Sequence, residues 1–385
     1  MPKITPDVET FARIKVIGVG GSGCNAVNHM ISSDVKDVDF IVMNTDSQHL
    51  HHASAKKKVH LGKNLTRGLG SGMNPDVGKR AAEETKEEIL EAVQGADMVF
   101  VTCGLGGGTG SAASEVVARA AKESGALTVA VVTKPFTFEG LQRMRIAEDA
   151  LSNLSDAVDA LIVIPNDRLL ETVDKNTSAK DAFAMCDDIL RQAVEGISDL
   201  ITTPGIINVD FADIRAVMED AGSALMGVGV ATGEKRAEKA ALAAINSPLL
   251  ELSVDGARGV LFSISGSDDL TMHEIQDAAR IITESADPEA RVIFGTVRDT
   301  SLKKGEIKIT VIASGFPGGA GMLNRTTNPS LFTEEENPEE LKEEREQTKR
   351  MDVQPDRNRP AREENDSDDD DWSSVPAFLR RSKLK

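Results

Sequence analysis

The sequence predicts an α/β fold in which a Rossmann-like parallel sheet is followed by one long helix, a second and smaller α/β domain, and a polar tail. Apolar, strand-like runs alternate with helical patterns from Arg13 to about Leu170, which is typical of a parallel sheet covered by helices. Glycine-rich loops follow two of these runs, at the sheet edge where ligands bind. A second, shorter series of apolar runs begins after residue 203.

Residues 1–10 are expected to form an N-terminal extension, and residues 11–177 the first domain. Its predicted strands are 13–17, 38–43, 98–101, 127–132 and 160–164.

A single long helix is predicted over residues 178–201, and we assign 178–202 as a central helix. Ser178 and Asp181 have the spacing of a capping box. Thr203-Pro204-Gly205 is expected to end the helix. The apolar residues at helical spacing are Phe183, Cys186, Ile189, Leu190, Ala193, Val194, Ile197 and Leu200.

Residues 203–316 are expected to form the second domain. Its predicted strands are 205–209, 260–264, 291–295 and 307–312, and its predicted helices are about 211–220, 233–245 and 270–285.

The tail divides into two parts by composition. Residues 317–371 are predicted to be a disordered acidic linker, because segments poor in apolar groups cannot offset the entropy of ordering. Within it, residues 331–371 carry 17 acidic and 7 basic side chains. Residues 372–385 combine apolar anchors with a basic cluster, which favours a docking peptide over a frayed end.

Bulk composition excludes several classes of protein. The net charge of −18 argues against nonspecific nucleic-acid binding. The three cysteines lie far apart without a CxxC pair, which argues against disulfides and zinc. No apolar run is long enough for a signal segment or a membrane span, so we expect a soluble cytoplasmic protein without direct membrane insertion.

The most informative motif is the loop Cys103–Ser111, which has five glycines among the seven residues 104–110. Glycine allows positive φ and close approach of the backbone to a ligand. The following helix start offers N–H groups and a positive dipole end, so the loop predicts a phosphate site.

Two further glycine loops are less specific. Gly18–Gly23 fits G-x-G-x-x-G and leaves open a Rossmann-type, NAD-binding oxidoreductase. The acidic residue that such a site needs about 20 positions later is poorly matched. Residues 68–75 could close over a terminal phosphate or serve as a flexible connector.

Two charged pairs and a histidine cluster each allow a structural and a functional interpretation. Glu139 and Arg143 could form a surface ion pair or contact ribose and phosphate. Asp210 could cap a helix with Asp213 at its third position, or both could hold water or a cation for phosphoryl transfer. His49, His51, His52 and His60 favour a solvated loop over a metal site.

Taken together, the motifs resemble the FtsZ family, the bacterial tubulin-like cell-division GTPases. The resemblance covers about residues 11–316 and the terminal peptide. Residues 106–111 are similar to the tubulin-type phosphate loop, 208–213 to the family's catalytic loop, and 375–381 to its C-terminal peptide. Ser111-Ala112-Ala113 stands where the family commonly has Thr-Gly-Ala, and the ending Ser382–Lys385 is more basic than in many relatives.

The resemblance implies a tubulin-like GTP-binding domain and a residue set for GTP or GDP. Glu139 and Arg143 would contact the sugar and phosphates, and Asn166, Phe183 and Asp187 would hold guanine. The whole implied set is Gly20, Gly21, Ser22, Gly23, Cys24, Asn25, Asn44, Gly70, Ser71, Gly72, Gly104, Gly106, Gly107, Gly108, Thr109, Gly110, Ser111, Thr133, Pro135, Glu139, Arg143, Asn166, Phe183 and Asp187.

The resemblance also implies a filament mechanism with Mg²⁺. Asp210 and Asp213 of one subunit, supported by Asn208, would act on the GTP of the next subunit in a head-to-tail polymer. A membrane-tethering division protein such as FtsA or ZipA would bind the terminal peptide at the division site. The peptide residues are Trp372, Pro376, Phe378, Leu379, Arg380 and Arg381. A tubulin-like filament for DNA partition is the alternative within this class.

Overall fold

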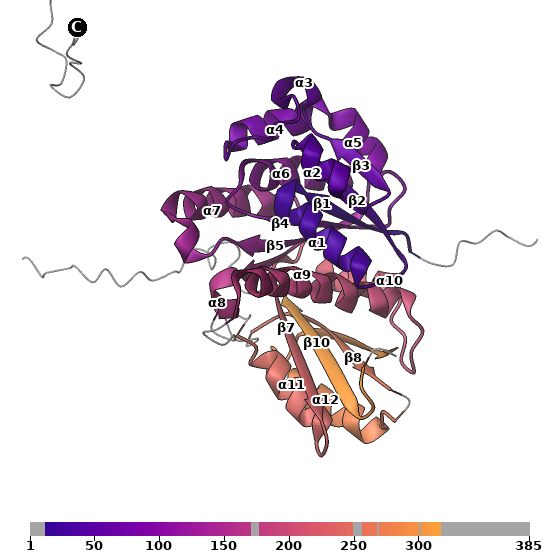
Figure 1. Ribbon diagram of the computed structural model, residues 1–385. Coiled ribbons are helices and arrows are strands. Elements are labelled where there is room, and N and C mark those ends of the chain that lie inside the picture. The colour runs from indigo at the N-terminus through magenta and orange to yellow at the C-terminus, as the bar shows by residue number, and fades with distance from the viewer. Residues whose placement is uncertain (1–11, 171–176, 249–255, 268, 300–301, 317–385) are drawn as a thin grey trace, which may run out of the picture. The chain divides into compact units, whose positions relative to one another are not determined.

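The computed structural model describes residues 12–170, 177–248, 256–267, 269–299 and 302–316. These residues contain a first α/β lobe, one long helix and a second α/β lobe (Figure 1). The predicted extension, the acidic linker and the terminal peptide lie outside the described residues.

The first lobe holds six strands, all parallel, in the order β3-β2-β1-β4-β5-β6. The strands are β1 (Ile14–Val19), β2 (Val38–Asn44), β3 (Lys57–His60), β4 (Met98–Gly104), β5 (Leu127–Lys134) and β6 (Ala160–Pro165). Five of them confirm predicted strands, and the short edge strand β3 was missed.

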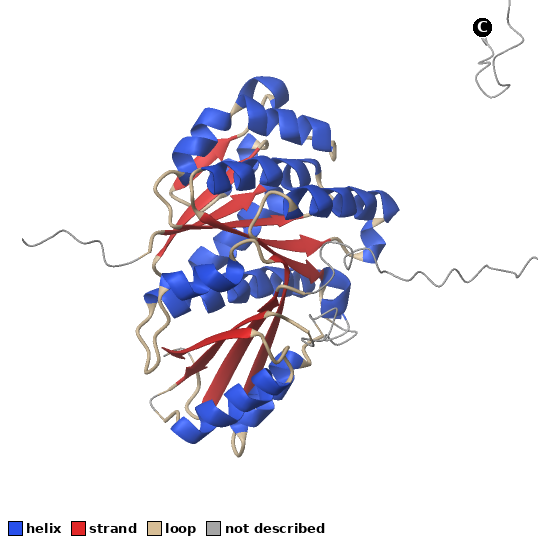
Figure 2. Ribbon diagram, turned by 180° about the vertical axis from the view of Figure 1, so that it is seen from behind, coloured by secondary structure: helices blue, strands red, loops and turns tan. Residues whose placement is uncertain are grey.

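Helices cover both faces of this sheet (Figure 2). The helices of the lobe are α1 (Gly20–Ser32), α2 (Ser47–His52), α3 (Lys63–Thr66), α4 (Pro75–Glu84), α5 (Lys86–Val93), α6 (Gly108–Glu123), α7 (Leu141–Ser155) and α8 (Asn166–Leu170), with a 3₁₀ turn η1 (Thr137–Glu139). Apolar residues of α4, α5, α6 and α7 pack on one face, and those of α1 and of the long helix pack on the other.

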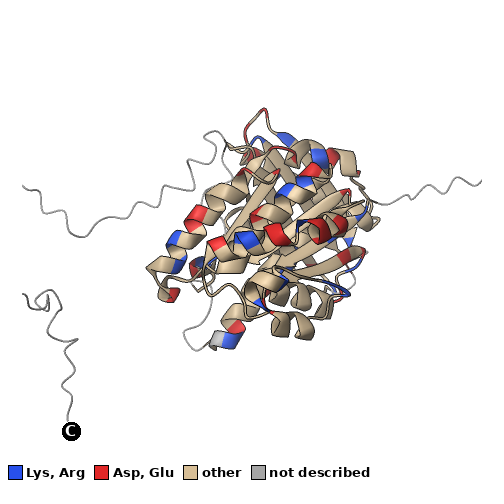
Figure 3. Cartoon of the chain, turned by 90° about the horizontal axis from the view of Figure 1, so that it is seen from above, with Lys and Arg blue, Asp and Glu red and all other residues tan. Residues whose placement is uncertain are grey.

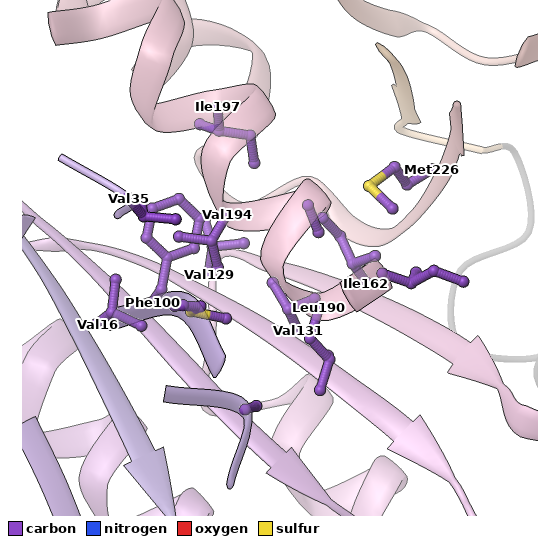
Figure 4. Packing of buried hydrophobic residues seen from close by; sticks show 14 of the residues in the cluster. Val16, Val35, Phe100, Val129, Val131, Ile162, Leu190, Val194, Ile197 and Met226 are labelled. Atoms are coloured by element: carbon purple, nitrogen blue, oxygen red, sulfur yellow. The ribbon is translucent and has the colours of Figure 1, made fainter. Parts of the chain in front are cut away.

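The long helix α9 (Ala179–Thr202) confirms the predicted central helix. The Ser178 hydroxyl accepts a hydrogen bond from the Asp181 N–H at 3.2 Å, which is the predicted cap. Its apolar face, with Leu190, Val194 and Ile197, lies over the sheet residues Val129 and Ile162 (Figure 4).

The second lobe continues the sheet through β7 (Gly222–Thr232). The first residues of β7 pair in parallel with β6, and the remainder pairs with β10 (Glu306–Ser314) in antiparallel order. β8 (Gly259–Gly266) and β9 (Arg291–Arg298) complete the order β7-β10-β8-β9. α11 (Arg236–Ile245) and α12 (Met272–Glu284) cover one face, while α10 (Phe211–Met218) joins the core on the side of α9.

One prediction for the second lobe was wrong, and one strand was missed. Residues 205–209 form no strand. The N–H groups of Ile206 and Ile207 both donate hydrogen bonds to the Thr296 hydroxyl oxygen, each at 2.9 Å. Gly205 approaches the Thr296 carbonyl too closely for any side chain. The strand β7, rich in glycine and alanine, was missed.

Seen from above, acidic and basic residues are intermingled along the outer helices (Figure 3), as is usual for solvated surfaces. No helix within the described ranges is long and apolar enough to cross a bilayer.

Candidate functional site

A cavity of about 520 Å³ opens at the carboxyl ends of the parallel strands. This volume is typical of a pocket for a small-molecule ligand. Sixteen of its lining residues were implied by the resemblance: Gly21, Ser22, Asn25, Ser71, Gly104, Gly107, Gly108, Thr109, Gly110, Thr133, Pro135, Glu139, Arg143, Asn166, Phe183 and Asp187. The sequence reasoning did not include Met73, Leu105, Cys186 and Leu190, which also line it.

One end of the pocket is built from backbone. Helix α6 starts at Gly108 after the N-cap Gly107, and no side chain caps it. Its first N–H groups therefore lack intrahelical partners and are available to an anion. Gly20 has a φ of +74°, and a side-chain carbon there would lie 2.9 Å from the Gly110 nitrogen. The Gly18–Gly23 loop and the Cys103–Ser111 loop, which are the first and second glycine loops in chain order, thus meet backbone to backbone.

The third glycine loop, residues 68–75, contacts the second through hydroxyl groups. Thr109 Oγ1 lies 2.7 Å from Thr45 Oγ1 and 2.9 Å from Ser71 Oγ. Gly70 and Gly72 adopt φ values of +83° and +61°, which few residues other than glycine tolerate. This loop is therefore shaped to present Ser71 and Met73 to the pocket, and it is more than a flexible connector.

Eight residues of the implied set do not line the cavity. They are Gly20, Gly23, Cys24, Asn44, Gly70, Gly72, Gly106 and Ser111. Their roles in the structure are to shape the loops. The Ser111 hydroxyl accepts a hydrogen bond from the Gly106 N–H at 2.9 Å, and burial raises the pKa of the Cys24 thiol to about 12.

The other end of the pocket combines an aromatic ring with the side chains of Asn166 and Asp187. Asn166 is 6% exposed, and its Oδ1 is buried without a hydrogen-bond partner among the described residues. Burial raises the pKa of Asp187 to about 6, which nearby His29 partly opposes. Phe183 is half exposed and contacts Phe136 edge to face at 5.4 Å. These groups form an acceptor-rich site beside a flat apolar surface.

Glu139 and Arg143 form an ion pair of 2.8 Å, and both line the pocket. Glu139 also accepts a hydrogen bond from the Phe136 N–H at 3.0 Å. The structural and the functional interpretation of this pair are therefore compatible.

None of the three predicted catalytic residues lines this pocket. Asp210 is the N-cap of α10 and accepts a hydrogen bond from the Asp213 N–H at 2.9 Å, as in the structural interpretation. The Asn208 side chain accepts from the Gly205 N–H at 2.7 Å and supports the loop. All three side chains are exposed.

These acidic residues lie at the opposite edge of the sheet. Arg215 of α10 donates to the carbonyl of Gly125, just before β5 begins, at 3.3 Å. Helix α9 connects the two edges. Phe183 lines the pocket, while Thr202 lies beside Arg13 and Val38 at the amino ends of β1 and β2. The 19 steps along the helix from Phe183 to Thr202 span about 28 Å.

The histidine cluster is not the solvated loop that the sequence suggested. His49, His51 and His52 lie on α2, and His60 ends β3. Among the described residues, no three His, Cys, Asp or Glu side chains gather as a group that could hold a metal ion.

Comparison with known proteins gives two matches that together span both lobes. Residues 13–174 match the GTPase domain of the Tubulin/FtsZ family, and residues 222–317 match the C-terminal domain of the FtsZ family.

Solved structures agree with these matches. An empty FtsZ dimer from M. jannaschii is 44% identical, with a TM-score of 0.77 over 80% of this chain and 89% of that chain. A GTPγS-bound protofilament of CetZ2 from Haloferax volcanii is 21% identical, with a TM-score of 0.68 over 81% of this chain and 95% of that chain, and it shares the fold.

Proposed function

The chain belongs to the FtsZ family of polymerising, tubulin-like GTPases of cell division, and we propose that it hydrolyses GTP between successive subunits of a head-to-tail filament. The match to the GTPase domain sets aside the NAD-binding oxidoreductase, and the match to the FtsZ C-terminal domain sets aside the DNA-partition filament. The matched FtsZ is archaeal, so the family assignment does not depend on a bacterial origin.

The proposed orientation of the nucleotide follows from the chemistry of the two ends of the pocket. The uncapped start of α6 suits the phosphates, and Phe183, Asn166 and Asp187 suit the base. A carboxylate at Asp187 can accept from both the N1–H and the 2-amino group of guanine. Adenine lacks this donor pair, so binding it would leave the Asp187 carboxylate without these two hydrogen bonds. Glu139 and Arg143 would contact the sugar and phosphates between these ends.

Magnesium is proposed as an ion carried in with the triphosphate. The side chains near the start of α6 are neutral hydroxyls, those of Ser71 and Thr109. Such a donor set suits Mg²⁺ held chiefly by phosphate oxygens and water, with few protein ligands. The ion would offset the negative charge of the phosphates, and the residues of this chain would orient them.

The observation that carries the proposal is the separation of the triphosphate pocket from Asp210 and Asp213. The two sites lie at opposite edges of one sheet, so a subunit cannot apply its own carboxylates to its own GTP. A second subunit stacked in the same orientation would bring them to the pocket. Head-to-tail contacts of this kind do not close and generate filaments. Asp210 and Asp213 would then orient the attacking water, with Asn208 holding their loop.

The test is to follow light scattering and phosphate release in parallel, with and without GTP. Turnover per molecule should rise cooperatively with protein concentration as assembly begins. Asp213→Ala should bind GTP and assemble but release almost no phosphate. Turnover per molecule that stays constant on dilution, or full turnover by Asp213→Ala, would exclude hydrolysis at the subunit contact.

We further propose that the terminal peptide links the filament to the membrane at the division site. The peptide's apolar residues and its arginines Arg380 and Arg381 follow a long acidic segment, as in a tethered docking motif. Membrane-tethering division proteins such as FtsA or ZipA are the proposed partners, on the inner face of the membrane.

A further inference from the structure

His49 lies directly behind the wall of the nucleotide pocket, between two asparagines. Its Nδ1 is 3.1 Å from Asn44 Nδ2, and its Nε2 is 3.0 Å from Asn25 Oδ1. The ring also packs on the first glycine loop, because a side-chain carbon at Gly21 would lie 3.8 Å from it. Asn25 and Gly21 line the pocket, whereas His49 and Asn44 do not.

The orientation of the Asn44 amide is fixed by the backbone. Its Oδ1 accepts hydrogen bonds from the N–H groups of Thr45 at 2.8 Å and Asp46 at 3.3 Å. Asn44 is buried, and turning its amide would place Nδ2 against these two donors. Nδ2 must therefore face His49.

The orientation of Asn44 determines the tautomer of His49. An amide nitrogen can only donate, so His49 Nδ1 must accept and cannot carry a proton. In a neutral imidazole the hydrogen is then on Nε2. Nε2–H donates to Asn25 Oδ1, and no hydrogen bond among the described residues engages Asn25 Nδ2. The two N–H groups of Asn25 are thus left for a ligand in the pocket.

Asn25 lies on the nucleoside side of the site. One helical turn further along α1, His29 Nε2 is 3.4 Å from Asp188 Oδ1, and Asp188 is the neighbour of Asp187. The phosphate cradle is instead formed by the loops at Gly108 and Ser71.

We propose that His49 is a positioning residue, which fixes Asn25 as a hydrogen-bond donor to an acceptor atom of the bound nucleoside. The inference rests on the proposed GTP site. Without His49, the Asn25 amide could turn and direct its oxygen at the same acceptor. The loss of one oriented hydrogen bond corresponds to a roughly five- to tenfold weaker affinity.

The tautomer can be tested without any nucleotide. Long-range ¹H–¹⁵N correlation spectra of the full chain, labelled with ¹⁵N-histidine, distinguish a protonated from an unprotonated ring nitrogen. The His49 signals would be assigned by their loss in His49→Gln. We expect a protonated Nε2 and an unprotonated Nδ1 in the neutral ring. A proton on Nδ1, or an even mixture of both tautomers, would overturn the inference.

The effect on binding is tested with two variants of opposite polarity pattern. His49→Gln keeps one acceptor and one donor at a similar separation, whereas His49→Leu keeps neither. His52→Leu, at an exposed position on the same helix, is the matched control. The probes are fluorescent GTP and GDP analogues, at protein concentrations too low for assembly.

We expect His49→Leu to bind GTP and GDP roughly five- to tenfold more weakly. His49→Gln should stay within about twofold of the wild type, as should His52→Leu. In a separate assay at protein concentrations that allow assembly, the kcat at saturating GTP should be unchanged in all of them, because the contact is to the nucleoside. Equal affinity of His49→Leu and the wild type would refute the positioning role alone. A wild type that binds no guanine nucleotide would refute the proposed function, and with it this inference.

Discussion

A side-chain carbon at Gly78 in α4 would lie 2.2 Å from the carbonyl oxygen of Gly108, where α6 begins. The two backbones therefore touch, and α4 supports the loop from behind. The same helix begins at the end of the third glycine loop, where the Asn74 side chain caps it. Helix α4 thus connects the stability of the lobe to the shape of the pocket.

Gly78→Ala should therefore destabilise the protein and weaken nucleotide binding. In an exposed helix the same change stabilises by about 1 kcal/mol, because alanine is the better helix former. Here we expect an overpacking cost of about 1–3 kcal/mol, measured by urea unfolding. The control Arg80→Ala, at an exposed position of α4, should change neither property. A Gly78→Ala protein that is more stable than the wild type would contradict the close contact.

The parallel sheet and α9 could be predicted because their sequence signals are local and strong. Runs of β-branched residues mark β1, β4 and β5, and a capping residue with helical periodicity marks α9. β7 was missed because Gly227 and Gly229 replace the expected bulky residues. A side-chain carbon at either position would lie 2.0 Å from a carbonyl of α11. The sequence shows these glycines but not the helix that requires them.

The site residues could be predicted where a residue type points to one role, as in the glycine loops. They could not be predicted where the packing of a helix or strand determines whether a side chain faces the pocket or the core. The glycine loops and Asp187 line the pocket, as the motif resemblance implied. Cys24 and Asn44 lie behind it, because α1 and β2 turn these side chains into the core. Cys186 and Leu190 line the pocket although their spacing suggested only core positions, since the same face of α9 serves both.

Nucleotide affinity should fall as the pH is lowered through about 6. Burial raises the pKa of Asp187 to about 6, and only its carboxylate form can accept from the N1–H and the 2-amino group of guanine together. Below that pH the proton must first be lost, so affinity should drop by up to about tenfold per pH unit. The measurement is GDP affinity from pH 5 to pH 8. In Asp187→Asn the affinity should be low and nearly independent of pH. A wild-type affinity that is constant between pH 5 and pH 7.5 would be incompatible with this role.

Replacing Asp199 by asparagine should stabilise the protein at high pH. Burial on α9, together with nearby Glu195 and Asp299, raises the pKa of Asp199 to about 7, against the opposing effects of Lys308 and Arg191. The folded state therefore binds a proton that the unfolded state releases, and stability is lost as the pH rises through this window.

We expect Asp199→Asn to gain about 1–3 kcal/mol at pH 8, by urea unfolding. The gain should be smaller at pH 5, because the loss of stability from the aspartate builds up between its ordinary pKa of 3.8 and about 7. A variant that is less stable than the wild type at pH 8 would show that the carboxylate is a net stabilising partner of Lys308.

Removal of residues 372–385 should leave the GTPase intact. Among the described residues, those that line the pocket and form the α10 loop all come before 317. Phosphate release by the shortened chain should match the full chain at every concentration, while binding to a membrane-tethering division protein should be lost. A fall in turnover would show that the peptide takes part in assembly.

Mixing two inactive variants tests whether one subunit supplies the triphosphate pocket and its neighbour supplies the carboxylates. Asp213→Ala retains the pocket, and Asp187→Ala retains the acidic loop. Each alone should release almost no phosphate from GTP. We expect an equimolar mixture to regain a substantial part of the wild-type rate, because Asp187→Ala can stack its acidic loop on a GTP-loaded Asp213→Ala subunit. A mixture that is no more active than the sum of its components would contradict the claim.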